Sequence, residues 1–410
     1  LCVSNFVGKT AFAAVNLIMP LPMLLGTIGF MLGTGGSAIV GITLGEGDQK
    51  KADRYFTLFL LAALVSVSVL AVLGIVFLRP IAVLLGAKGE LLDYAVRYGR
   101  ILMVSLPTFA LQNMFQSFFV TAEKPHLGFW FTVGAGCTNM VLDVLMVGVW
   151  GWGVEGAAIA TFISQLVGGV LPVFYFIDRS NSSRLHLCKT SFYSKVLRDA
   201  CINGSSELMT NLSMSLVNIL YNYQLLRLAG ENGVAAYGVI MYAAFLFVAV
   251  FVGYAVGSAP IVSFHYGARN HAEVHNLYRK SLRLIAVVAV TLTLASMFII
   301  PCVARIFVGY DAELLALTSR AFRLYALSFL IMGFNVYASS FFTALGDGVT
   351  SALISFLRTL AFQVIAILLL PLLLGIDGIW LAVTAAELAA LAVSAAMLLT
   401  KDKVFHYRKA

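Results

Sequence analysis

An acidic residue in the middle of a long apolar stretch is the first feature of this sequence that could do chemistry. Asp143 lies in the segment from about His126 to Trp150, which has the length of a bilayer-spanning helix. An aspartate inside a membrane costs about 3 kcal/mol on insertion scales, so such residues usually serve a function. A buried carboxyl group can exchange a proton for a cation, because burial favours the neutral acid and an approaching cation favours the carboxylate.

Two further polar side chains could act together with this carboxyl group. Asn139 precedes Asp143 by four residues, so both lie on one face of a helix within about 6 Å. Thr161 lies in the next apolar segment, after the short connection WGWGVEG. In the alternative interpretation, Asp143 is hydrogen-bonded to Asn139 and only fixes how the helix packs.

Other residues in the apolar segments could contact a substrate or a proton. Carboxylates and aromatic faces both attract organic cations. These candidates are Gln112, Gln116, Glu207, Asn211 and Tyr254. For Glu207 the alternative is a capping acid near the cytoplasmic end of its helix, and for Tyr254 it is core packing or lipid contact. Glu387 and Arg358 are expected to form a structural ion pair.

The composition is that of a polytopic membrane protein. Hydrophobic residues make up 60% of the 410 residues and charged residues 11%, whereas soluble domains contain about 25% charged residues. The net charge of +8 comes from Lys and Arg in short loops and in the tail KDKVFHYRKA, as in cytoplasmic loops. We therefore expect the lipid bilayer, and no nucleic acid, as a partner.

The sequence contains no pattern typical of an enzyme. It has neither a nucleophile with a neighbouring base nor a phosphate-binding glycine loop followed by Lys, which excludes catalytic residues and an ATP-driven pump. The five cysteines lack paired spacing, and His271 and His275 lie in a polar loop, so we expect no disulfide framework and no metal site. No cofactor is expected either.

Apolar windows of about twenty residues or more predict the membrane helices. Residues 1–7 are expected to be the end of an earlier helix. The predicted helices cover residues 11–43, 53–78, 91–121, 126–150, 155–178, 202–229, 233–266, 276–300, 313–344, 349–373 and 378–400.

The two halves of the chain repeat each other at an offset of about 222 residues. GVEGAAIAT from Gly153 matches GIDGIWLAV from Gly375, and Gly35 matches Gly257 in the same register. The second half contains six predicted helices, and an even number gives both copies the same orientation across the membrane. Most of the first helix of the first copy is therefore expected to lie upstream of Leu1.

These observations predict an all-α polytopic membrane protein with two six-helix lobes related by a pseudo-twofold axis along the membrane normal, twelve helices in the intact protein. The expected divisions are an N-lobe over 1–178, a cytoplasmic link over 179–198, a C-lobe over 199–400 and a basic cytoplasmic tail over 401–410. The excess of Lys and Arg in alternate loops places both termini in the cytoplasm. We expect a multi-pass monomer in the plasma membrane.

Three stretches of this sequence resemble the multidrug and toxic compound extrusion (MATE) transporters. They are GTGGSAIVGITLGEGDQKKA from Gly33, NMVLDVLMVGVWGWGVEGAAIAT from Asn139, and GSAPIVSFHYGARN from Gly257. The stretch NGSSELMTNLSMSLVNILYN from Asn203 is more similar to the DinF and MepA members than to NorM. The resemblance implies a secondary active efflux antiporter that exports amphipathic, cationic small molecules in exchange for H⁺ or Na⁺ by alternating access.

The resemblance also implies a cation-coupling site. In DinF-like members an Asn and an Asp on the fifth helix and a Thr on the sixth help form it, and Asn139, Asp143 and Thr161 fill these positions. That family site also uses an Asp on the first helix, which would lie upstream of Leu1. NorM-like members have an acid on the tenth helix, where this sequence has Asn335, so a NorM-type second site is in doubt.

Two other functions remain open from the sequence. One is a flippase for lipid-linked or polyisoprenoid substrates from the same superfamily, which would need a cationic cavity, whereas the interior charges here are mostly acidic. The other is a membrane receptor or scaffold that transports nothing. Drug accumulation in efflux-deficient cells would separate the three.

Overall fold

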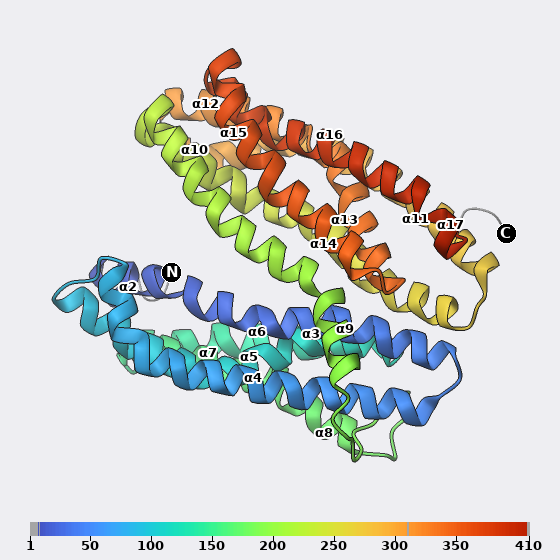
Figure 1. Ribbon diagram of the computed structural model, residues 1–410. Helices are drawn as coiled ribbons and strands as arrows, with labels where there is room; N and C mark the ends of the chain where they lie inside the picture. The colour runs from blue at the N-terminus through green and yellow to red at the C-terminus, as the bar shows by residue number, and fades with distance from the viewer. Residues whose placement is uncertain (1–6, 8, 310, 408–410) are drawn as a thin grey trace. The chain divides into compact units, whose positions relative to one another are not determined.

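The computed structural model describes residues 7, 9–309 and 311–407 (Figure 1). They form helices, with no strand among them, which confirms the predicted all-α membrane fold. The chain divides into two compact units, Leu1–Gly204 and Ser205–Ala410. Apart from Val7, the helix end expected at residues 1–7 lies outside the described residues, and so do the last three residues of the tail, 408–410.

The helices of the first unit follow the apolar segments of the sequence. The segment expected over 11–43 forms two helices with Met19 between them, and the segment expected over 126–150 ends in a π-helical turn, η1. The elements are α2 (Lys9–Ile18), α3 (Pro20–Gly45), α4 (Gln49–Leu84), α5 (Glu90–Thr121), α6 (Pro125–Asp143), η1 (Val144–Val149), α7 (Gly153–Gly169), α8 (Leu171–Ile177) and α9 (Ser194–Asn203).

The second unit contains the remaining predicted helices. Its first element contains two helices that meet at Gly230, where φ is 61° and ψ is −151°, so the expected segments 202–229 and 233–266 separate there. The elements are α10 (Ser205–Gly267), α11 (His271–Val308), α12 (Ala312–Ala326), α13 (Phe329–Ala344), α14 (Gly348–Phe356), η2 (Leu357–Ala361), α15 (Phe362–Leu374), α16 (Ile376–Thr400) and α17 (Asp402–Phe405).

Equivalent turns in the two units have equivalent local structure. Asp48 accepts a hydrogen bond from Lys51 N at 3.0 Å and caps α4, and Asn270 accepts one from Glu273 N at 3.1 Å and caps α11. Gly153 and Gly375 begin the corresponding later helices with φ of 58° and 59°, a left-handed conformation that favours glycine. The repeat in the sequence is therefore also a repeat of backbone conformation.

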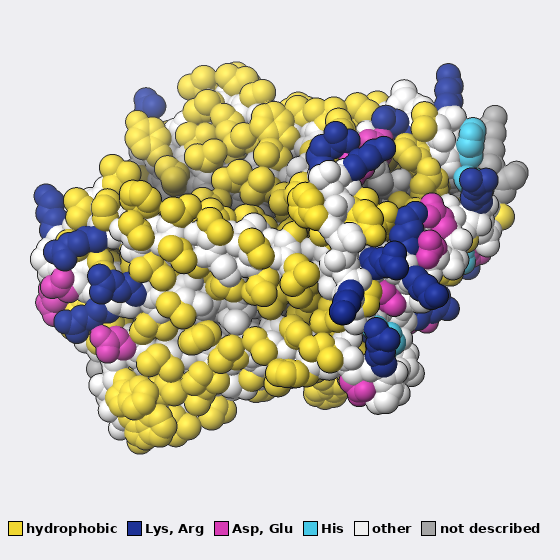
Figure 2. All heavy atoms as spheres, turned by 60° about the horizontal axis from the view of Figure 1, so that its bottom comes forward, with side chains coloured by type: hydrophobic (Ala, Val, Ile, Leu, Met, Phe, Trp, Pro, Cys, Tyr) yellow, Lys and Arg dark blue, Asp and Glu magenta, His cyan; other side chains and the backbone are white. Residues whose placement is uncertain are grey.

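The surface and the helix lengths are those of a protein that crosses a membrane several times. In the described part of the chain, eight helices are long and apolar enough to span a bilayer, or nine if the bent pair α12 and α13 counts as one. On the face shown in Figure 2, hydrophobic side chains cover the middle and Lys and Arg gather toward the two ends. This distribution matches an apolar layer between two polar surfaces.

Glycines on α3 let its backbone approach two other helices closely. A Cβ atom on Gly29 would lie 2.6 Å from Ala110 Cα of α5, and one on Gly35 would lie 2.5 Å from Gly204 N and overlap the carbonyl oxygen of Ala200 in α9. Such backbone-to-backbone crossings need small residues. The glycines of α3 thus hold α5 and α9 against it within the first unit.

The polar segment between α8 and α9 is fixed to the first unit. His186 N donates to Asp53 Oδ1 at 3.0 Å, and Cys188 N donates to Thr57 Oγ1 at 3.1 Å. Thr190 Oγ1 donates to the carbonyl oxygen of Arg54 at 2.8 Å. These contacts tie the chain to the beginning of α4, so much of the link expected at 179–198 belongs structurally to the first unit.

At one end of the second unit, the last turns of the chain contact the loop between α13 and α14. Lys401 Nζ lies 2.8 Å from Asp347 Oδ2, and the Asp347 carboxylate also accepts hydrogen bonds from Thr350 N and Thr350 Oγ1. Burial alone would raise the pKa of Asp347, but the hydrogen bonds from Lys401 and Thr350 outweigh it and hold that pKa below its usual value. This carboxylate therefore contributes stability in its ionised form.

We expect Lys401→Gln to lower the free energy of unfolding at pH 7 by about 1 kcal/mol, because the pair is partly exposed. Folding lowers the pKa of Asp347. Its contribution to the free energy of unfolding is therefore complete above the pKa of the unfolded chain, about 3.9, and is lost as the pH falls through the lower pKa of the folded protein. Denaturation of the purified wild type and the Lys401→Gln variant between pH 7 and pH 3 should show their free energies of unfolding converging as the pH falls. Lys403→Gln, at an exposed position, is the control. A difference that stays constant in acid would contradict the prediction.

Candidate polar sites in the two units

The carboxyl group that the sequence singled out lies where α6 changes from α-helical to π-helical geometry. Asp143 is the last residue of α6, and η1 begins at Val144. A π-helical turn redirects the side chains that follow and is frequent at functional sites. Asp143 Oδ1 is buried and has no hydrogen-bond partner among the described residues. The site therefore presents a carboxylate oxygen that is free to bind a proton or a cation.

The two residues predicted to act with Asp143 contact each other. Asn139 Nδ2 donates to Thr161 Oγ1 at 3.4 Å, which links α6 to α7, and Thr161 Oγ1 donates to the Ala157 carbonyl oxygen at 2.9 Å. The described hydrogen bond of Asn139 is thus directed to Thr161 and not to Asp143. Carboxylate, amide and hydroxyl oxygens of this kind are ligands that hard cations accept.

A small cavity lies beside this group within the first unit. Its volume is about 70 Å³, and Thr161 and Gln165 of α7 line it together with residues of α3 and α5 and with Met19. Gln165 Oε1 is buried without a partner among the described residues. The full lining is Met19, Pro22, Met23, Leu102, Ser105, Leu106, Phe109, Thr161 and Gln165.

Two residues of this region were not identified from the sequence. Gln165 is neutral, but it corresponds to Glu387 in the repeat. Gln165 lies twelve residues after Gly153, and Glu387 lies twelve residues after the matching Gly375. Tyr98 of α5 is buried, interacts electrostatically with Asp143 and donates to Met19 Sδ at 3.6 Å. The repeat could have identified Gln165, whereas nothing in the sequence associates Tyr98 with Asp143.

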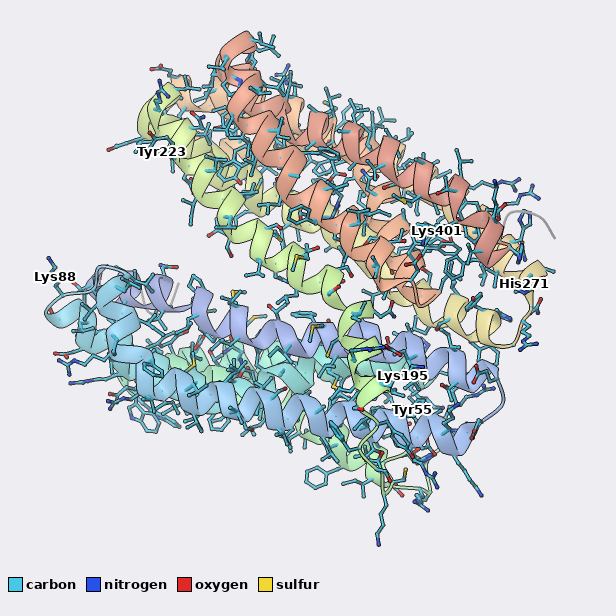
Figure 3. The ribbon with its side chains drawn as sticks, viewed as in Figure 1. Tyr55, Lys88, Lys195, Tyr223, His271 and Lys401 are labelled. Atoms are coloured by element: carbon cyan, nitrogen blue, oxygen red, sulfur yellow. The ribbon has the colours of Figure 1, made fainter. Side chains whose placement is uncertain are left out.

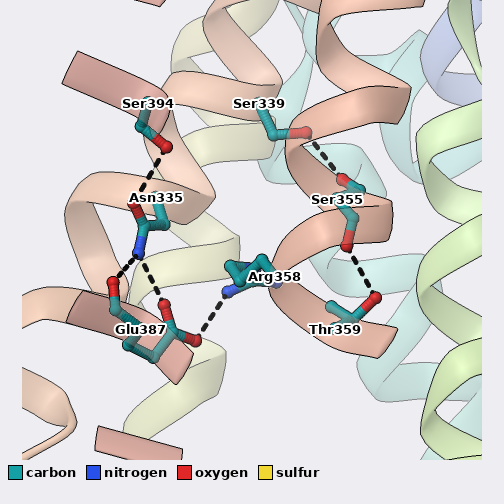
Figure 4. A network of polar contacts seen from close by, with 7 residues as sticks. All are labelled: Asn335, Ser339, Ser355, Arg358, Thr359, Glu387 and Ser394. Carbon is teal, nitrogen blue, oxygen red and sulfur yellow. Dashed lines mark hydrogen bonds and ion pairs between the residues drawn. The ribbon is translucent and has the colours of Figure 1, made fainter. Parts of the chain in front are cut away.

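The second unit contains a buried polar network (Figure 4). Arg358 Nη1 donates to Glu387 Oε1 at 3.3 Å, which confirms the predicted pairing. Asn335 Nδ2 donates to Glu387 Oε2 at 2.7 Å, and Ser394 Oγ donates to Asn335 Oδ1 at 2.9 Å. The Glu387 side chain is 1% exposed, so these donors replace water as its partners.

Glu207 lies in the first turn of α10, and α10 contacts η2, which carries Arg358. Asn211 Nδ2 donates to the Glu207 main-chain carbonyl at 2.8 Å, so the Asn211 amide is occupied locally on the helix.

The structure does not bring the remaining candidates together with the Asn139 and Thr161 pair. Gln112 lies against Gly168 of α7, and Gln116 is exposed. Tyr254 Oη donates to Ser281 Oγ at 2.8 Å and its ring lies 6.2 Å from that of Tyr337, inside the second unit. Their part in substrate binding stays a prediction.

Comparison with known proteins gives the family context. The MatE family model matches residues 1–145 and 208–369. The multidrug export protein MepA of Staphylococcus saprophyticus is 21% identical over 407 residues, which cover 98% of this chain and 88% of that protein.

Two solved structures share the fold. One is a multidrug resistance MATE family transporter of the MOP superfamily in an outward-facing conformation, with a TM-score of 0.92, 23% identity, and coverage of 100% of this chain and 91% of that chain. The other is a MOP superfamily transporter from Pyrococcus furiosus, whose binding pocket has reverse polarity that suggests a different function. Its TM-score is 0.90 and its sequence identity is 22%. The match covers 100% of this chain and 91% of that chain.

Proposed function

This chain belongs to the MatE family, and from that premise we propose that it exports amphipathic, cationic small molecules in exchange for H⁺ or Na⁺. Among its relatives, MepA of Staphylococcus saprophyticus is a multidrug export protein. The observation that carries the proposal is the Oδ1 atom of Asp143. It is buried, has no hydrogen-bond partner among the described residues, and lies one helical turn from Asn139, which is bonded to Thr161. We therefore assign coupling to Asn139, Asp143 and Thr161.

The coupling follows from competition for one carboxylate. With no cation near it, a carboxylate in an apolar surrounding binds a proton, and an approaching cation makes the ionised form favourable again. H⁺ or Na⁺ and a cationic substrate therefore exclude each other at Asp143. The cavity lined by Thr161 and Gln165 could hold an apolar part of a substrate.

We further propose a monomer in the plasma membrane with both termini in the cytoplasm. In the first unit, Tyr55 and Lys195 lie toward one end and Lys88 at the opposite end, and in the second unit His271 and Lys401 lie toward the end away from Tyr223 (Figure 3). The loops at the ends with Lys195 and Lys401 carry most of the Lys and Arg, which supports their cytoplasmic placement.

We expect lipophilic cations to compete with one another for export and size-matched anions to compete weakly. A carboxylate in a surrounding of low dielectric constant attracts an organic cation and repels an anion. The measurement uses vesicles loaded with a fluorescent lipophilic cation and challenged with cations and anions of the same size. Equal inhibition by the two sets would contradict the electrostatic basis of the proposal.

A flippase for lipid-linked or polyisoprenoid substrates is the second candidate. Arg358, which is largely buried, is the observation in its favour, because such a substrate carries a phosphate. The Glu387 carboxylate at 3.3 Å neutralises that charge, so we rank export of cations first. Stronger inhibition by anions in the same vesicles would favour the flippase, and the absence of any transport would favour a receptor or scaffold.

A further inference from the structure

Three cations on α11 of the second unit have no anionic partner. Arg279, Lys280 and Arg283 are exposed, and none of them forms an ion pair with a described residue. Arg279 and Arg283 are four residues apart and therefore neighbours on the helix surface, where like charges repel and weaken a helix. Glu273, the single acid of α11, accepts hydrogen bonds from Asn276 at 3.2 Å. We call the three residues the α11 cation group, and a bound anion would stabilise it.

The helices that pack against α11 do not supply the missing negative charge. They are α10, α12 and α13, and no acid among their described residues is paired with the α11 cation group. The ion pairs in the described part of the second unit are Arg320–Asp377, Arg358–Glu387 and Lys401–Asp347. The acids that form ion pairs in this unit are therefore bound to other cations.

The α11 cation group borders the apolar stripe by which this helix faces the lipid. The exposed side chains of the stripe are Val287, Val290, Leu294 and Phe298. At 3.6 residues per turn, these positions and the three cations fall on one face of the helix. Arg283 comes one turn before Val287, about 6 Å along the helix axis. The cations thus lie where the apolar stripe ends, and basic side chains at that place can reach the phosphates of lipid headgroups.

The first unit indicates that the fold does not require these charges. The capping residues Asp48 of α4 and Asn270 of α11 match in the repeat, and the same register pairs buried residues of the two helices such as Leu78 and Ile300. In this register the α11 cation group matches Thr57, Leu58 and Leu61. Leu61 is 45% exposed, so the apolar lipid-facing stripe of α4 includes the position that Arg283 occupies on α11. The three cations are therefore a feature of the second unit alone.

We propose that the α11 cation group binds the headgroup of an anionic phospholipid, whose acyl chains lie along the apolar stripe from Val287 to Phe298. A guanidinium can donate two parallel hydrogen bonds to one phosphate, and Arg279 and Arg283 are close enough to bind the same phosphate from two sides. Lys280 adds a third positive charge. His271 begins α11 and marks the end of the second unit to which the group is nearer, so the lipid belongs to the leaflet at that end (Figure 3). The proposal does not depend on which compounds the chain exports.

The test is native mass spectrometry of the purified full chain, titrated with dioleoylphosphatidylglycerol or with dioleoylphosphatidylcholine. Wild type should bind the anionic lipid more tightly than the zwitterionic one. The triple variant Arg279→Gln, Lys280→Gln and Arg283→Gln should bind the first phosphatidylglycerol about 100-fold more weakly, because each Lys or Arg near an anionic lipid contributes a factor of about five. Its affinity for phosphatidylcholine should not change.

A second triple variant controls for net charge. Lys50, Lys189 and Lys195 of the first unit are also exposed and without an ion pair among the described residues. Their replacement by Gln removes the same charge and should leave the affinity for the first phosphatidylglycerol unchanged. Equal weakening by the two triple variants would show that attraction follows net charge, and it would overturn the proposal.

Two further measurements keep the proposal open to refutation. An excess of inorganic phosphate should not displace the bound phosphatidylglycerol, because a free anion lacks the acyl chains; displacement would contradict a lipid site. If the triple variant does not fold, Arg283→Leu decides, since it copies Leu61 of the first unit. This variant should weaken binding of phosphatidylglycerol about fivefold. An affinity equal to that of wild type would refute the assignment.

Discussion

Export of a fluorescent lipophilic cation should fall to the level of cells without the transporter when Asp143 is replaced by asparagine. The amide has the shape of the acid but cannot bind or release a proton, and it does not carry the charge that attracts a cation. Asp143 Oδ1 has no hydrogen-bond partner among the described residues, so the substitution breaks no described hydrogen bond at that atom and should leave the protein folded. Accumulation in efflux-deficient cells measures the loss, and gel filtration confirms folding.

Two controls show whether the effect is specific to this carboxylate. Asp178→Asn removes an exposed acid of the same unit that accepts a hydrogen bond from Ser180 N at 2.9 Å, and it should export normally. Asn139→Ala should keep part of the activity, because the described bond of Asn139 goes to Thr161. Cells with Asp143→Asn that exclude the cation as well as wild-type cells would end the coupling hypothesis for the first unit.

Gly35→Ala should strongly destabilise the first unit. The added methyl group would overlap the carbonyl oxygen of Ala200 and lie 2.5 Å from Gly204 N, and both are main-chain atoms that cannot rotate away. Overpacking costs about 1–3 kcal/mol, and we expect the upper end here because α3 and α9 would have to separate. The apparent melting temperature in mild detergent, followed by fluorescence-detected gel filtration, measures the change.

Gly136→Ala is the matched control for this substitution. Gly136 is also inside a helix, but a Cβ atom there would have no neighbour within 4 Å. Alanine favours the helix by about 1 kcal/mol over glycine, so this variant should be as stable as wild type or more stable. Equal melting temperatures for the two variants would mean that the crossing of α3 and α9 tolerates a methyl group.

The positions of the helices could be predicted because the bilayer requires apolar segments of a certain length. Their ends were harder to predict, since polar residues continue the helices beyond the apolar windows. The helix expected over 53–78 covers Gln49–Leu84, and that expected over 276–300 covers His271–Val308. Caps such as Asp48 and Asn270, outside the apolar windows, set these beginnings.

The candidate sites were predictable to the extent that charge identified them. Asp143, Glu387 and Arg358 are conspicuous because ionised groups are rare in membrane helices. Neutral partners such as Tyr98, Gln165 and Ser281 look like ordinary helix residues, so their contacts could not be predicted. For the same reason the contact of Tyr254 could not be predicted: its hydroxyl group donates to Ser281 inside the second unit.

The hydrogen bonds that hold the segment after α8 against α4 leave little free chain in the link between the two units. A free chain can extend by about 3.5 Å per residue, so an unattached link over residues 179–198 would allow two domains to move far apart. Here Thr190 is bonded to Arg54, α9 follows from Ser194, and Asn203 Nδ2 donates to the Gly35 carbonyl at 3.4 Å, one residue before Gly204. A protease that needs an extended, unbound substrate should find few cleavage sites between the units, despite the polar sequence there.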